Sequence, residues 1–185
     1  RQTAQNFGYG QNLDIPLQVT PSVFPEDMNQ AQLALSSIGQ YDVRTTPLQV
    51  AMASAAIAND GVMMRPSLIK TVRSSDLSVI DQFQAEQLRR STDAETARTV
   101  KDLMTSVVSN GIASGAAVPG VQVAGKTGTA EIGRDGLNDS WFTGFAPADD
   151  PQLAVAVVVE DVDVTTGSSL TSPSARQLFE AVLNK

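Results

Sequence analysis

A continuous apolar run from Leu153 to Val159 constrains the fold of this chain more than any other segment. Pro151 opens the run, and no polar residue alternates with the apolar ones. Such a pattern predicts a strand that is covered on both faces, and therefore a central strand of a sheet. We expect the rest of the chain to supply neighbouring strands and covering helices.

Two more strands are predicted directly before this run. Val121–Ile132 has β-forming residues near both ends and small residues between them, and Trp141–Phe145 is a short second strand. The polar segment Gly133–Asp139 between them is typical of a connection between antiparallel strands. We interpret Asp139 and Ser140 as turn residues. Three such strands would leave an apolar edge unpaired, so further strands are expected from elsewhere.

Three helices are predicted around these strands from local start signals. Two of them begin with a capping box, and the third begins with an N-cap serine followed by proline. The signals are Thr46 with Gln49, Thr92 with Glu95, and Ser172 with Pro173. The last helix is expected to bury one stripe, made of Ala175, Leu178, Phe179 and Val182. Helices before and after sequential strands indicate an α+β fold.

The composition excludes several kinds of active site. The 185 residues include no histidine and no cysteine, which removes Ser-His-Asp and Cys-His catalysis, the usual metal ligands and disulfides. We therefore expect no metal and no cofactor, and an acyl-transfer site here would need lysine as its base. The net charge of −7, without a basic run, argues against nucleic acid as a partner. No apolar run approaches the ~20 residues that cross a membrane.

Polar and small residues in the middle of Val121–Ile132 form a candidate binding strand. Lys126 would supply a positive charge for a carboxylate, and Thr127 and Thr129 would add hydroxyl hydrogen bonds. Gly128 would let a ligand approach the backbone, and a free strand edge would supply an N–H for an oxyanion hole. The alternative is an ordinary strand, with a solvated lysine, a glycine bulge and threonines that suit β structure. The tripeptide alone favours this alternative, because three-residue motifs occur by chance.

The order of several short motifs along the chain favours the binding strand over the ordinary strand. Together they resemble the C-terminal half of the transpeptidase domain of class B penicillin-binding proteins, with the overall match nearest to actinobacterial members. The segments are Ile38-Gly39-Gln40, Thr46-Pro47-Leu48-Gln49, Ala56–Gly61, Arg65-Pro66, Ala124–Glu131, Trp141–Pro147 and Pro173. The resemblance implies that residues 1–185 are one portion of a single transpeptidase domain.

The resemblance also implies a fold like that of the serine β-lactamases, with a five-stranded antiparallel sheet between helical layers. This chain would supply the last three strands. Two strands from residues preceding Arg1 would cover the apolar edge of Leu153–Val159.

The activity implied by the resemblance is peptidoglycan cross-linking by serine acyl transfer. The family's serine attacks D-Ala-D-Ala stem peptides, and β-lactam antibiotics trap the acyl-enzyme. Its motifs are Ser-x-x-Lys, Ser-x-Asn and Lys-Thr-Gly. By this resemblance Lys126, Thr127 and Thr129 bind the substrate carboxylate, Gly128 permits close approach, and the Thr129 backbone N–H is an oxyanion donor. Glu131 and Trp141 are assigned to structure.

The sequence departs from the family pattern at the nucleophile. It contains no Ser-x-Asn, and its one Ser-x-x-Lys is Ser67 with Lys70. We reject this pair, because a serine and a lysine three residues apart meet on a helix, whereas Pro66 precedes them and the segment reads as extended. Ser67 and Lys70 are expected to face solvent. The isolated chain is therefore predicted to be inactive and the complete protein to be a D,D-transpeptidase.

Two alternatives remain at this stage. One is a β-lactamase or β-lactam sensor, which the Thr-Pro-Leu-Gln helix and the Trp-Phe-Thr-Gly-Phe strand disfavour. The other is a non-catalytic binding module. The resemblance further implies a site at the outer face of the cytoplasmic membrane, through an anchor outside this chain, and the family often works beside a glycan-polymerising membrane partner. The fragment itself is expected to be soluble.

Overall fold

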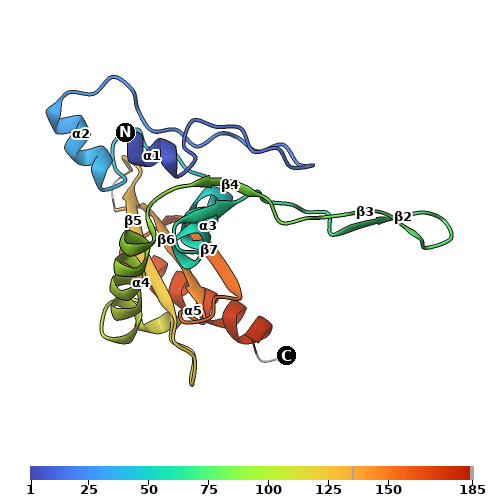
Figure 1. Ribbon diagram of the computed structural model, residues 1–185. Coiled ribbons are helices and arrows are strands. Elements are labelled where there is room, and N and C mark those ends of the chain that lie inside the picture. Colours follow the sequence, from blue (N-terminus) through green and yellow to red (C-terminus); the bar gives the residue numbers. More distant parts are fainter. Residues whose placement is uncertain (135, 184–185) are drawn as a thin grey trace.

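The computed structural model describes residues 1–134 and 136–183. Figure 1 shows a central sheet with helices around it and a hairpin, β2 with β3, that projects far from the rest. The elements are α1 (Gln2–Asn6), α2 (Gln30–Ser37), α3 (Pro47–Ala58), β1 (Val62–Met64), β2 (Thr71–Arg73), β3 (Val79–Gln82), β4 (Gln87–Arg90), α4 (Ala94–Ser109), a 3-10 turn (Ser114–Ala116), β5 (Ala124–Glu131), β6 (Asn138–Ala146), β7 (Leu153–Val162) and α5 (Val164–Leu183).

The main sheet has the order β5-β6-β7, and both pairs of neighbours are antiparallel. This confirms three sequential antiparallel strands. The prediction that Leu153–Val159 is a central strand is wrong for the described residues, since β7 is an outer strand of this sheet. Of its residues only Val155 is fully buried, and most of the other apolar side chains are half-buried. The central strand is β6, where Phe142 and Phe145 are completely buried.

Both faces of the sheet pack on helices: α5 on one face, α3 on the other, and α4 on both. Residues directly opposite one another on neighbouring strands share a face. One face carries Phe142, which clusters with Val108 of α4 and Phe179 of α5. The other face carries Phe145, which clusters with Ile57 of α3. Figure 1 shows α4 running alongside β5, where it contributes to both clusters. The layered α+β architecture is thus confirmed.

The predicted start of α3 is confirmed, but half of its capping box is wrong. Thr46 Oγ1 accepts a hydrogen bond from the backbone N–H of Gln49 at 3.2 Å, and Pro47 occupies the first turn. The Gln49 side chain does not return to Thr46. It is 2% exposed and instead donates to the carbonyl oxygen of Phe7 at 2.6 Å. The Thr46 N–H donates to Ser22 Oγ at 3.1 Å. The buried glutamine therefore ties α3 to the chain before it.

The predicted cap of α4 is displaced by one residue. Asp93, not Thr92, is the N-cap, and its Oδ1 accepts from the Thr96 N–H at 2.7 Å. A carboxylate accepts this bond more strongly than a hydroxyl, which explains why Asp93 prevails over the Thr92–Glu95 capping box. Hydrogen bonds from Thr96 hold the pKa of Asp93 below its ordinary value.

The predicted start of α5 at Ser172 and Pro173 is wrong. The helix begins at Val164, where Asp163 Oδ1 accepts from the N–H groups of Thr165 and Thr166, each at 3.0 Å. Pro173 lies inside the helix, at the cost of one intrahelical hydrogen bond. Close packing of Gly167 on Ser140 of β6 fixes the first turns, because an added Cβ would lie 2.3 Å from Ser140 Cβ.

The predicted apolar stripe of α5 is confirmed in part. Ala175 and Phe179 are completely buried, whereas Leu178 and Val182 are 46% and 44% exposed. The stripe is narrower than predicted because only two of the four positions reach the sheet.

Several elements were not predicted as such, although Val62–Val72, which includes β1 and the start of β2, reads as extended in the sequence. Helix α2 begins with a capping box of Asn29 and Gln32. Strand β1 pairs with β4, and β2 pairs with β3 in the projecting hairpin. These strands have three or four residues each, too few to show a periodic pattern. The assignment of Asp139 and Ser140 to a turn is also wrong, since both lie within β6, opposite Ala130 and Thr129. Among the described residues, no helix has the length and apolarity needed to cross a membrane.

Candidate active site

The candidate site lies along the outer edge of β5. Within the part of the chain that the structure describes, β5 has one neighbour in the sheet, β6. The carbonyl oxygen of Thr129 accepts a hydrogen bond from Gln40 Nε2 at 3.2 Å, and that of Thr127 accepts one from Lys126 Nζ at 2.6 Å. These carbonyls therefore face away from β6. Because the N–H and C=O of one residue in a strand point to the same edge, the Thr129 N–H also points away from β6.

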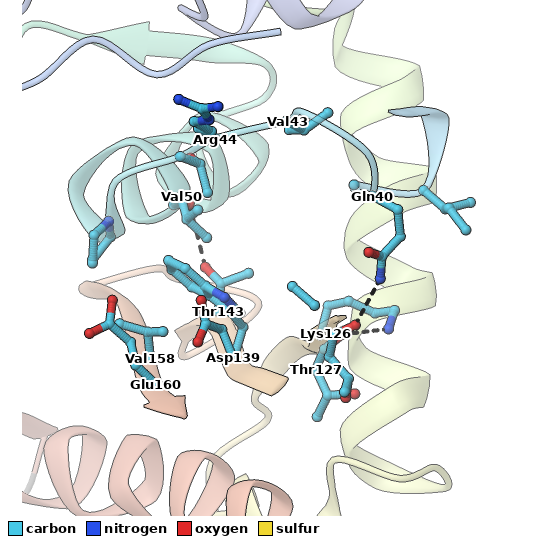
Figure 2. Close-up of a pocket in the computed structure, with 18 of the residues that line it drawn as sticks. Gln40, Val43, Arg44, Val50, Lys126, Thr127, Asp139, Thr143, Val158 and Glu160 are labelled. Carbon is cyan, nitrogen blue, oxygen red and sulfur yellow. Dashed lines mark hydrogen bonds between the residues drawn. The ribbon is translucent and has the colours of Figure 1, made fainter. Parts of the chain in front are cut away.

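One face of β5 opens onto a cavity of about 480 Å³, a size typical of small-molecule sites. Lys126 and Gly128 lie on this face, opposite Thr143 and Trp141 of β6. Figure 2 shows that the remaining walls come from the α2–α3 connection, from α3 and from β7. The residues from those walls include Gln40, Val43, Arg44, Val50, Val158 and Glu160.

All four predicted binding residues line this cavity. Lys126 and Thr129 are exposed, and Thr127 and Gly128 are half-buried. The pairing of β5 with β6 continues without a shift through Gly128, so a bulge does not explain this glycine. An added Cβ at Gly128 would lie 3.3 Å from Trp141 Cβ, which is a tight contact. Gly128 therefore keeps space open between β5 and the Trp141 side chain.

Charged side chains of both signs surround the cavity. Lys126 stands near Gln40, while Asp139 of β6 and Glu160 of β7 lie together beyond Thr143 (Figure 2). Arg44 is highly exposed, and its nearest acid is Asp42, at 3.5 Å. The site thus offers a cationic side chain at the β5 edge and two acids farther along the sheet. No three Asp or Glu side chains in the described ranges are grouped to hold a metal ion.

Hydroxyl groups beneath the cavity join α3 to the sheet. Thr143 Oγ1 lies 2.6 Å from Ser54 Oγ and donates to the carbonyl oxygen of Val155 at 3.0 Å. It also lies 3.4 Å from the Val50 carbonyl oxygen. This cluster fixes the distance between α3 and β6, and with it the width of the cavity.

Sequence reasoning missed part of the site. Trp141 was assigned to structure, yet it lines the cavity. Gln40 and Thr143 were noted only as members of larger segments, although both contact site elements. The alternation of side chains along Asp139-Ser140-Trp141-Phe142-Thr143 could have placed Thr143 and Trp141 on one face, opposite to Phe142.

The rejected pair of Ser67 and Lys70 lies outside the cavity lining and is exposed. Ser67 Oγ donates to the Ile69 carbonyl oxygen and accepts from the Ile69 N–H, which makes a local turn and no contact with Lys70. The prediction that both residues face solvent is confirmed, though they lie in a connection and not in a strand. Among the described residues, no serine lines the cavity.

A second cavity, of about 490 Å³, adjoins Lys126 and Thr143 on the α4 side. Its lining is almost entirely apolar. The residues include Phe7, Ile57, Val100, Leu103, Met104 and Val107. Leu103 is 64% exposed, although it lies on a helix whose neighbouring residues are in the core.

Comparisons with known proteins agree with this geometry. The family model described as the penicillin binding protein transpeptidase domain matches residues 1–183. The peptidoglycan D,D-transpeptidase PbpA of Mycolicibacterium smegmatis is 44% identical over 177 residues, which are 92% of this chain and 36% of that protein. Stage V sporulation protein D of Bacillus subtilis is 33% identical over 180 residues, which are 91% of this chain and 28% of that protein.

A solved structure shares the fold. Penicillin-binding protein A from M. tuberculosis, as an imipenem acyl-enzyme complex, superposes with a TM-score of 0.90 at 39% identity, over 99% of this chain and 41% of that one. The predicted resemblance to actinobacterial members is confirmed. The chain spans little more than a third of the length of the PbpA relatives that it matches.

Proposed function

The chain belongs to the penicillin-binding protein transpeptidase family, and we propose that the complete protein cross-links peptidoglycan by serine acyl transfer. Its substrates are D-Ala-D-Ala stem peptides, and β-lactams inhibit it by forming an acyl-enzyme. One observation carries the proposal: Lys126, Thr127, Gly128 and Thr129 stand on a strand whose outer edge opens onto the cavity. The M. smegmatis relative is named a peptidoglycan D,D-transpeptidase, which supports the same reaction.

In the proposed reaction β5 binds the substrate and stabilises the developing charge. The ammonium group of Lys126 and the hydroxyls of Thr127 and Thr129 bind the terminal carboxylate through charge-assisted hydrogen bonds. Gly128 lets the peptide approach the strand. The Thr129 N–H, which points to the outer edge, donates to the carbonyl oxygen as it becomes negative. The serine displaces the last alanine, and an amine of a second stem peptide then takes the acyl group.

The nucleophile is proposed to come from a segment outside residues 1–185. Three observations support this assignment. The cavity lining holds no serine in the described ranges, and Ser67 makes only a local turn. The apolar cavity beside Lys126 is suited to burying a packed segment, and such a segment would bring a side chain next to the cationic end of the site. Residues 1–185 would then be the C-terminal portion of one transpeptidase domain.

Location and partners follow from the family resemblance and are also proposals. The complete protein would act at the outer face of the cytoplasmic membrane through an anchor outside these residues. A glycan-polymerising membrane protein would be its neighbour. Fractionation of cells that produce the complete protein tests the location, because an anchored enzyme stays with the membrane pellet after a salt wash.

Fluorescent penicillin tests the activity. We expect the complete protein to carry a covalent label that survives denaturing electrophoresis, and we expect isolated residues 1–185 to stay unlabelled. Failure of the complete protein to label would overturn the proposal, and labelling of the isolated chain would overturn the assignment of the nucleophile. The lifetime of the label separates a transpeptidase, which releases a β-lactam slowly, from a β-lactamase, which releases it within seconds.

A further inference from the structure

We infer that Gln40 is a positioning residue that holds the outer edge of β5 in the geometry needed for acyl transfer. The inference rests on the proposed function and deepens it. Gln40 lies in the α2–α3 connection, 89 residues from Thr129 in sequence, and its side-chain amide reaches that strand directly (Figure 2). It is half-buried at the cavity wall.

The end of α2 determines where Gln40 stands. The backbone N–H of Gln40 donates to the carbonyl oxygen of Leu35 at 3.0 Å. The N–H of Gly39 donates to the carbonyl oxygen of Ser36 at 3.1 Å. Gly39 has a φ of +81°, which completes a Schellman motif. Tyr41 follows with a φ of +64°, a value that disfavours residues with a side chain. The backbone on both sides of Gln40 is therefore constrained, and the side chain is directed toward β5.

The hydrogen bond from Gln40 takes the place of a backbone partner at the outer edge of β5. In the described sheet, nothing pairs with the outer edge of β5, so the Thr129 carbonyl has no backbone partner there. Gln40 Nε2 donates to this carbonyl oxygen at 3.2 Å. The hydrogen bond fixes the backbone orientation of Thr129 and hence the direction of its N–H, which belongs to the same residue and points to the same edge.

Fixing this N–H matters because an oxyanion donor acts only within about 2.7–3.1 Å of the developing charge. The strand ends two residues later, at Glu131, and Gly133 follows in the connection with a φ of +73°. An unpaired strand end with only one neighbouring strand is free to fray. Gln40 anchors that end from outside the sheet. It is not itself placed to touch the reacting atoms, and its effect passes through Thr129.

Replacement of Gln40 in the complete protein tests this role. Gln40→Met keeps the length of the side chain and removes the donor, and Gln40→Glu removes the donor but keeps the shape. Gln84→Met, on the exposed segment after the hairpin, is the matched control. The measurement is acylation by fluorescent penicillin over a range of concentrations, which yields the maximal rate and the half-saturating concentration separately.

We expect Gln40→Met and Gln40→Glu to lower the maximal acylation rate about 5- to 10-fold, the range for one neutral hydrogen bond. The half-saturating concentration and the Tm should stay at the values of Gln84→Met. An unchanged or faster rate in Gln40→Met would overturn the inference, as would a Tm that falls with the rate, since that indicates a structural role only. Both outcomes leave the proposed function standing, which fails only if the unsubstituted protein does not label.

Discussion

The two outer strands of the main sheet flank the same central strand and differ sharply in character. Strand β5 presents Lys126, Thr127, Gly128 and Thr129, which are small or polar and line a cavity. Strand β7 presents an apolar run in which most side chains are half-buried. Exposed sheet edges usually carry charge, whereas an uncovered apolar edge invites association. The contrast supports the proposals that the β5 edge receives a ligand and that further protein covers the β7 edge.

Side chains satisfy two of the outward backbone carbonyls of β5. On β5, side chains of Gln40 and Lys126 hydrogen-bond the outward carbonyls of Thr129 and Thr127. Such contacts are single and local, so a ligand can add to or replace them. A strand that is meant to be buried needs a continuous backbone partner instead. The β5 edge can therefore stay open in the folded protein.

The largest effect is expected from Phe142→Ala in β6, which supports both outer strands. Phe142 is completely buried between α4 and α5, and its loss should lower the free energy of unfolding by about 3–5 kcal/mol. Denaturant titration of the complete protein measures this change. Phe83→Ala is the control, because Phe83 is 40% exposed near the hairpin and should change little. Equal effects of the two substitutions would show that β6 is not the shared support.

Gly128→Val should separate ligand binding from stability at the β5 edge. The added side chain would press on Trp141 and fill the cavity face, so we expect acylation to fall on the order of 10- to 100-fold. The midpoint of unfolding should move little, because Gly128 is only half-buried. Gly128→Ala should give an intermediate rate. If both variants acylate at the normal rate, Gly128 does not mark the approach of the substrate.

Val157→Ala should produce the reverse pattern at the β7 edge. Val157 packs against the cluster that contains Phe142, and removing two methyl groups should cost about 1–2 kcal/mol. The acylation rate should be unchanged, since Val157 lies on the face opposite the cavity. Unfolding and labelling of the same preparation provide both values. A lower acylation rate at unchanged stability would contradict the view that β5 binds the ligand and β7 contributes only packing.

The smallest effect concerns the helix caps at acidic pH. A hydrogen bond from the Thr166 hydroxyl, and then one from its backbone N–H, lowers the pKa of Asp163, and bonds from Thr96 lower that of Asp93. A carboxyl whose pKa is lower in the folded state contributes stability above the unfolded pKa, and that stability is lost as the pH falls through the folded value. The Tm should therefore fall slightly when the pH is lowered below the range in which aspartate side chains ordinarily titrate.

Asp163→Ala and Asp93→Ala distinguish the contributions of the two helix caps to the acid dependence of stability. Each variant should lose part of this acid dependence, with Asp163 acting on α5 beneath β6 and β7, and Asp93 on α4 beside β5. Thermal unfolding at pH 6 and pH 3 gives the comparison. An acid dependence identical to that of the unsubstituted protein in both variants would exclude the caps as its source.

Local composition predicted the three strands of the main sheet, and the resemblance to the family pointed to the residues on the β5 edge. Local patterns failed where distant segments decide the outcome. The Ser172–Pro173 signal is local, but Asp163 and the packing of Gly167 on Ser140 extend α5 backward past it. Likewise, a residue as remote from β5 as Gln40 can only be assigned to that strand once the loop is placed in space.

The hairpin of β2 and β3 was also not predictable from the sequence, but for a different reason. Its strands are mostly exposed and contact chiefly one another, so no burial pattern marks them in the sequence. Leu77 and Ile80 are among its highly exposed apolar residues. A two-stranded hairpin gains little from its own contacts, and only the turn residues hold its register.

The most direct test of the β5 edge as a substrate-binding wall compares Lys126→Ala with Lys70→Ala in the complete protein. Both lysines are exposed, but only Lys126 lines the cavity. Loss of a hydrogen bond to a charged carboxylate should lower the second-order rate constant for acylation by fluorescent penicillin about 10- to 100-fold in Lys126→Ala. Lys70→Ala should match the unsubstituted protein. Equal rate constants for the two variants would contradict the account.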